Sequence, residues 1–222
     1  MRTLSLAAVV VCALAAAPQV AQATANQAPK VWLMGLVEQA KELAARKQGK
    51  SAKSKERWKS EIKAVVDEIL DWDELSRRAL GRQYKKLKDA ERKEFGELLR
   101  AMIEASYQSK LSLNTGKDNK RGRVSIEWLD EKITGDKAKA TARVKSGKSE
   151  VVLEFRMLSN KKQWRVYDVS IDDVSTVRTY RSQFRKIISR DGFPALLTRL
   201  RTKTEEIRSG RADVSSLKSV DK

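Results

Sequence analysis

The sequence predicts an α+β protein, with helices packed on an antiparallel sheet of about four strands. Apolar residues recur at helical spacing as far as residue 107 and again from residue 177, whereas between residues 124 and 171 they alternate with polar residues. The turns within the alternating part are short, which favours antiparallel pairing. Hydrophobic residues make up 41% of the 222 positions, which is enough for one packed domain.

The first 25 residues have the pattern of a cleavable signal peptide. Arg2 precedes the apolar run 4–17, which is too short to span a bilayer, and small-residue cleavage patterns follow it. Cleavage would also remove Cys12, the only cysteine. We therefore expect residues 26–207 to form the folded domain and residues 208–222 to be a polar, disordered tail.

Two helices are expected before residue 70. Spaced apolar residues predict the first over about residues 30–47, and a stripe from Trp58 to Ile69 predicts the second. Between them, residues 46–55 contain no large apolar side chain. We expect a solvated basic linker there.

Capping residues indicate two further helices. Asp71, followed three residues later by Glu74, is typical of the start of a short helix, and Gly81 predicts its end. Asp89 is placed to cap a longer helix with a broad apolar stripe over residues 95–107. This longer helix should bury much of its circumference.

Alternating segments predict the strands of the sheet, over about residues 124–128, 137–145, 151–157 and 164–171. In the second segment, small apolar residues alternate with mostly cationic ones. One face of that strand should therefore be small and apolar, and the other basic. The fourth segment has apolar residues on both faces, which is typical of a central strand.

The chain returns to helix after the sheet. Asp172 and Asp173 predict a turn, and Ser175 is placed to cap a helix whose apolar residues continue to Ile188. Gly192 should end that helix, and a last helix is expected from residue 193.

The residue inventory excludes most catalytic and metal sites. The chain has no histidine, so it lacks the usual general base and the commonest transition-metal ligand. Without Cys12, the mature chain has no thiol nucleophile and no Cys/His zinc site. No phosphate-binding glycine fingerprint is present. We therefore expect no catalytic residue, no metal and no cofactor, and a protein that is not an enzyme.

The chain is strongly basic, with a formal net charge of +18. One function that fits this charge is an exported module that binds polyanions, either nucleic acid or acidic polysaccharide. Aromatic residues are not interleaved with the basic ones as base stacking would need, and we expect no nucleic-acid partner. We expect instead that the basic strand face meets anionic membranes or acidic proteins. Its residues are Lys137, Lys139, Arg143 and Lys145.

Two stretches carry a resemblance to a known family. The first is residues 77–82, followed by the helix over residues 95–107. The second is Trp-Arg-Val-Tyr-Asp-Val at 164–169, followed in register by Val-Ser at 174–175 and Tyr-Arg-Ser-Gln-Phe at 180–184. Over about residues 31–201, the chain resembles the MlaC-type periplasmic phospholipid-binding proteins, the toluene-tolerance family.

The resemblance implies a periplasmic carrier that moves a phospholipid between inner and outer membranes and so serves outer-membrane lipid asymmetry. The phospholipid would be cargo rather than a cofactor. The implied partners are an inner-membrane ABC-type lipid transport complex, an outer-membrane lipoprotein and, transiently, the membrane itself.

The resemblance also implies that the acyl chains lie in an apolar cavity between sheet and helices. Small alanines on the second strand would leave space there, although a solid core made by the same residues is the alternative. Ser175, at a helix N-terminus, could face a phosphate or be a plain cap. Arg178 and Arg181 could meet a headgroup or be a solvated helix face. The residues expected to contact the lipid are Met102, Tyr107, Ala140, Val151, Phe155, Val166, Val174, Ser175 and Phe184.

Overall fold

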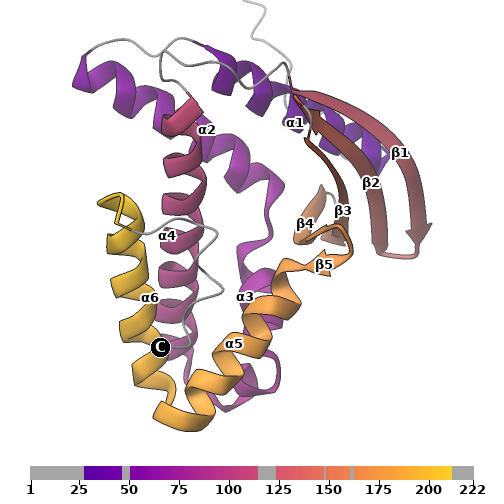
Figure 1. The fold of residues 1–222 in the computed structure, drawn as a ribbon. Helices are drawn as coiled ribbons and strands as arrows, with labels where there is room; N and C mark the ends of the chain where they lie inside the picture. The colour runs from indigo at the N-terminus through magenta and orange to yellow at the C-terminus, as the bar shows by residue number, and fades with distance from the viewer. Residues whose placement is uncertain (1–27, 47–50, 115–123, 148, 161–162, 212–222) are drawn as a thin grey trace, which may run out of the picture.

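The computed structural model describes residues 28–46, 51–114, 124–147, 149–160 and 163–211. The predicted signal peptide and most of the predicted tail lie outside the described residues. Most helices form a bundle on one side of the molecule and the sheet lies on the other, with the N-terminal helix running behind the sheet (Figure 1). The helices are α1 (Pro29–Ala45), α2 (Ala52–Ile69), α3 (Trp72–Leu80), the 3-10 helix η2 (Gly81–Lys86), α4 (Asp89–Asn114), α5 (Thr176–Asp191) and α6 (Phe193–Arg208).

The sheet is antiparallel, in the order β1-β2-β3-β4-β5, and confirms the predicted α+β class. It has five strands rather than about four. The fifth has two residues and forms because Asp172 and Asp173 turn the chain with φ of 46° and 64°. The strands are β1 (Ser125–Thr134), β2 (Lys137–Ser146), β3 (Ser149–Asn160), β4 (Gln163–Ile171) and β5 (Val174–Ser175).

The start and end predicted for α3 and the end predicted for α5 are confirmed. The side chain of Asp71 accepts a hydrogen bond from the Glu74 amide at 2.9 Å, and Gly81 ends α3 with a positive φ of 56°. Gly192 ends α5 with a φ of 82°. Asp89 is the first residue of α4 rather than its cap.

The prediction of a linker over residues 46–55 is wrong for its last part. Ser51 caps α2 by accepting a hydrogen bond from the Ser54 amide, and α2 starts at Ala52. Its first turn is exposed, so alanine and lysine suffice there without a large apolar residue. None of the described helices is long and apolar enough to span a bilayer.

The prediction that residues 164–171 form a central strand is confirmed in part. β4 lies between β3 and β5, but β5 has only two residues. Its two faces are buried because helices cover both. Val166 lies under α1 and α2, whereas Asp168 and Ser170 are buried on the face toward α3 and α5.

A helical cluster fills the space between α3, α4, α5 and α6. Phe95 is fully buried, and its ring contacts Phe184 edge to face at 5.6 Å between ring centroids. The ring of Tyr180 stacks on Phe184 at 5.5 Å. The cluster consists of Leu75, Ala79, Leu80, Phe95, Leu99, Met102, Ala105, Val177, Tyr180, Phe184, Ile187, Leu196, Leu197, Leu200 and Ile207.

Candidate functional site

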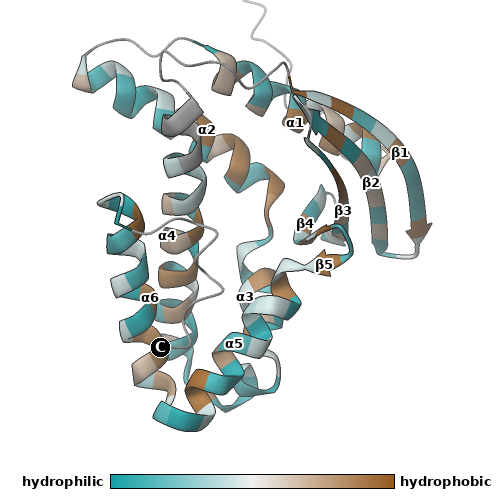
Figure 2. Cartoon of the chain, in the orientation of Figure 1, coloured by the Kyte–Doolittle hydropathy of each residue, from teal (hydrophilic) through white to brown (hydrophobic). Residues whose placement is uncertain are grey.

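Strand register brings the apolar residues of the sheet onto one face. Phe155 pairs with Ala140 on one side and with Val169 on the other, and directly paired residues point the same way. Hydrophobic and hydrophilic residues alternate along β1 and β2 (Figure 2). We call the following set the apolar sheet face: Ile126, Trp128, Ile133, Ala138, Ala140, Ala142, Val144, Val151, Leu153, Phe155, Met157, Val166, Val169, Ile171 and Val174.

Helices α1 and α2 cover one part of this face. Trp32 and Leu33 of α1 belong to the same buried cluster as Ala138, Ala140 and Met157. The alanines are small, so the helix can approach the strand closely. In this part the face is therefore a packed core, which is the alternative that the alanine pattern left open.

The other part of the apolar sheet face is incompletely covered. Val174 is 63% exposed and its strand partner Ile171 is 49% exposed. Val151 and Leu153 on β3 are half-buried. Ile171 and Val174 thus form a small apolar patch across adjacent strands, which is the candidate contact for an apolar partner.

Of the residues expected to contact lipid, most of those on strands share this face. Ala140 and Val166 lie in its packed part, and Phe155 packs against that part. Val151 and Val174 lie in its incompletely covered part. Alternation in the sequence had grouped Val151 with Phe155 and had put Ala140 on the apolar face of its own strand, because side chains of a strand alternate between faces. Val174 was expected from the family resemblance.

The remaining expected residues lie elsewhere. Met102 and Phe184 belong to the helical cluster and line a cavity of about 30 Å³ between α4, α5 and α6. That volume suits a water molecule rather than an acyl chain. Tyr107 is half-buried on α4, where burial, and next the carboxylate of Glu104, raise its pKa to about 12.

Ser175 is buried at the start of α5 and acts as a cap. Its hydroxyl accepts a hydrogen bond from the Arg178 amide at 3.0 Å and donates one to Asp168 Oδ2 at 2.6 Å. Asp168 Oδ1 accepts a third bond, from the Val177 amide at 3.0 Å. The buried Asp168 thus connects the sheet to α5. The sequence did not predict this role, although Asp168 belongs to the family motif at residues 164–169.

The opposite face of the sheet carries the basic residues that the sequence predicted there, and acidic side chains pair with three of the four. Lys139 forms an ion pair with Glu154 at 3.0 Å, and Arg143 forms one with Glu127 at 3.0 Å. Lys145 lies 3.5 Å from Glu150. The acidic partners come from β1 and β3, which flank β2. The charges of β2 alone could therefore not predict these ion pairs.

Hydrogen bonds shift the pKa values of two ion-paired residues on this face. Burial would raise the pKa of Glu154, but hydrogen bonds from Arg156 and Lys139 outweigh it and hold the pKa below its ordinary value. The bond to Glu154 raises the pKa of Arg156. Within the described residues, no cluster of acidic, cysteine or histidine side chains is placed to hold a metal ion.

The comparisons with known proteins agree with this architecture. The model of the MlaC protein family matches residues 36–202, which is well over half of the chain. The chain belongs to the MlaC family. The comparison with curated protein sequences gave no match.

A solved structure shows the same fold. It is the phospholipid-binding protein from Ralstonia solanacearum in complex with a phospholipid, with a TM-score of 0.62 and 16% sequence identity. The match covers 82% of this chain and 99% of the other. At this identity, the likeness is one of fold.

Proposed function

We propose that this MlaC-family chain is a periplasmic carrier that holds the acyl chains of a phospholipid against the apolar sheet face and moves the phospholipid between inner and outer membranes. The observation that carries the proposal is the incompletely covered part of that face, where Ile171 and Val174 are exposed beside half-buried residues of β3. The phospholipid bound by the Ralstonia relative supports the same ligand class.

The energetics favour exchange with a bilayer over release into water. A two-chain phospholipid has roughly 30 CH₂ groups, and exposing them to water would cost on the order of 24 kcal/mol. In a bilayer these groups are already dry. A carrier therefore needs only an equally dry site, and transfer in either direction can be nearly thermoneutral.

The helical cluster is a poor place for the acyl chains. Its cavity of about 30 Å³ is far below the several hundred Å³ of ordinary ligand pockets. Filling it with lipid would require α4, α5 and α6 to separate and expose a complete aromatic core. The sheet face needs no such change to present apolar surface.

The rest of the proposal follows from the family. The predicted signal peptide would direct the chain to the periplasm, where an inner-membrane ABC-type lipid transport complex and an outer-membrane lipoprotein would be its partners. The carrier would catalyse no reaction. Its residues would act by excluding water from the acyl chains and by docking.

Native mass spectrometry of the protein purified from the periplasm tests the proposal. We expect a mass above that of the mature chain, and organic extraction should release phospholipid and remove the excess. A mass equal to that of the mature chain, together with an empty lipid extract, would overturn the proposal.

A pair of variants on one strand locates the site. Leu153 lies on the apolar sheet face, and its neighbour Val152 lies on the opposite face; both are half-buried. Leu153→Gln should lower lipid content several-fold, whereas Val152→Gln should not. Thermal melts of both variants serve as the control for folding. Equal lipid content in the two variants would place the acyl chains elsewhere.

A further inference from the structure

A cluster of exposed cations lies on η2 and α5. Between Thr176 and Asp191, the only acidic residue is Asp191, and η2 contains none. We call the following exposed set the α5–η2 basic face: Arg82, Lys85, Lys86, Arg178, Arg181 and Arg185.

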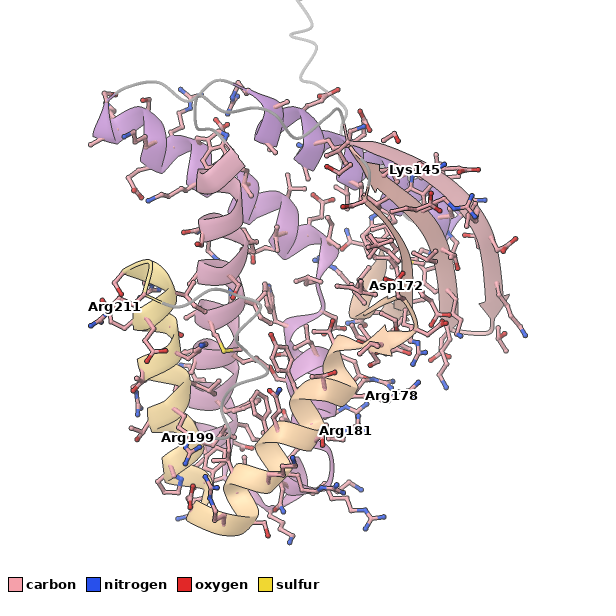
Figure 3. All side chains as sticks on the ribbon, viewed as in Figure 1. Lys145, Asp172, Arg178, Arg181, Arg199 and Arg211 are labelled. Carbon is pink, nitrogen blue, oxygen red and sulfur yellow. The ribbon has the colours of Figure 1, made fainter. Side chains whose placement is uncertain are left out.

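The contacts of Arg181 hold the two parts of this face together. Arg181 Nε donates a hydrogen bond to the Arg78 carbonyl at 2.7 Å, near the end of α3. A Cβ added to Gly81 would lie 3.3 Å from Arg181 Cδ, so the arginine lies directly against the start of η2. Arg178 and Arg185 lie one turn before and one turn after Arg181 on the same side of α5. Figure 3 shows Arg178 and Arg181 projecting from α5 away from α4 and α6.

The cations of the α5–η2 basic face contrast with those of β2, most of which have acidic partners. Cations on β2 pair with Glu127, Glu150 and Glu154, and Arg100 of α4 pairs with Asp67 and Glu104. Within the described part of the chain, no residue of the α5–η2 basic face forms an ion pair. Like charges gathered without counter-charges repel one another, and an anionic surface relieves that repulsion.

The kind of anionic partner follows from what surrounds these cations. A protein interface usually has an apolar or aromatic centre, and a single-stranded nucleic acid needs aromatic stacking platforms. The exposed large apolar residues of the described chain lie on α1, on strands or just before β1, and none lies on η2 or α5. A plane of laterally mobile phosphates needs only positive charge, because its headgroups adjust to the spacing of the cations.

We infer that the α5–η2 basic face docks the carrier onto the headgroups of anionic phospholipids in a bilayer. The inference rests on the proposed function, because a phospholipid carrier has to visit a membrane. The opposite side of α5 carries Tyr180, Phe184 and Ile187 into the helical cluster. Docking would therefore place this bundle, which α5 joins to the sheet through Asp168, against the headgroup plane.

Vesicle flotation tests the inference, with phosphatidylcholine vesicles that contain or lack phosphatidylglycerol. The parent protein should float with the anionic vesicles at low salt and not at high salt. A fourfold neutral variant leaves the structural Arg181 in place. It should bind the anionic vesicles roughly several hundred-fold more weakly, since each of the four basic residues contributes about fivefold near a membrane. The variant is Lys85→Gln, Lys86→Gln, Arg178→Gln and Arg185→Gln.

A matched variant removes the same charge from exposed positions on α2, β1 and α6. It should keep most of the parent's binding, because these residues lie outside the α5–η2 basic face. The matched variant is Lys53→Gln, Lys55→Gln, Lys132→Gln and Arg208→Gln.

Equal losses in the two variants would show that net charge alone drives binding and would overturn the inference, as would a parent that floats with neither kind of vesicle. The lipid content of each protein is measured separately by native mass spectrometry. A parent without bound phospholipid that still floats with anionic vesicles would contradict the proposed function and leave the docking face standing.

Discussion

In the helical cluster, Phe95 is fully buried and contacts Phe184 and Phe193, whereas on the apolar sheet face Ile171 and Val174 are about half exposed or more. Both regions are built from large apolar residues. The helices complete the first region on every side, while α1 and α2 complete only part of the second. A core that is complete stabilises the fold, and one that is incomplete leaves apolar surface for another molecule.

The largest expected loss of stability comes from making a cavity in the helical cluster. Phe95→Ala should destabilise the protein by about 3–5 kcal/mol, because it removes a fully buried ring and leaves a cavity between α4, α5 and α6. Denaturant unfolding of parent and variant measures this loss. A loss below about 1 kcal/mol would show that the cluster relaxes around the hole and is not rigidly packed.

Two substitutions by tryptophan compare the packed part of the apolar sheet face with its incompletely covered part. Ala140 has no exposed surface, so Ala140→Trp should cost about 1–3 kcal/mol or more through overpacking. Val151 is half-buried in the incompletely covered part, so Val151→Trp should change stability by less than about 1 kcal/mol and lower lipid content. Thermal melts and native mass spectrometry measure the two effects. Similar melts for both variants would remove the distinction between packed and incompletely covered parts.

Glu154 tests the opposite, ion-paired face through its pH dependence. Its folded pKa lies below its ordinary value, so the stability that it contributes is present above the unfolded pKa and is lost as the pH falls through the folded pKa. Glu154→Gln should therefore be less stable than the parent at neutral pH, and the difference should shrink in acid. A difference that stays constant down to low pH would show that the effect of the substitution does not depend on the ionised carboxylate.

The smallest expected effect concerns the turn that joins β4 to β5. Asp173 has a φ of 64°, a conformation that glycine adopts without strain. Asp173→Gly should stabilise the protein by up to about 1 kcal/mol. Asp172→Gly should not, because Asp172 Oδ1 accepts a hydrogen bond from the Val152 amide at 2.9 Å. Melting temperatures of the two variants test the difference.

The sequence predicted the parts of the fold that depend on nearby residues. Gly81, Gly192 and Ser175 act within one turn of their own positions, so their roles could be assigned from spacing alone. The short β5 could not be assigned, because its two residues are a strand only through pairing with Ser170 and Ile171. The helices that bury β4 include α1, α2 and α3, which are distant in the sequence, as well as the neighbouring α5.

The candidate site was predictable to the same degree. Alternation placed Val151 and Phe155 on one face of their strand, whereas Val174 was expected from the family resemblance. The strand register puts all three on the same face. The packed part of that face is the part that α1 covers. Because α1 ends at Ala45, long before β1 begins at Ser125, no local pattern in the strands encodes which part this is. Alternation likewise placed the cations of β2 on one face, but their acidic partners lie on the flanking strands and could not be predicted from β2 alone.

The register shift between Trp128 and Glu131 in β1 has a consequence for self-association. β1 is the outer strand of the sheet, and such edges recruit strands from other copies unless they are irregular or charged. The shift breaks the edge, the Lys30 amide donates a hydrogen bond to Glu131 Oε1 at 2.6 Å there, and Lys132 beyond it is exposed. Two copies that met through their exposed apolar residues would therefore find no continuous edge along which to extend the sheet, which protects a molecule with apolar surface from forming fibrils.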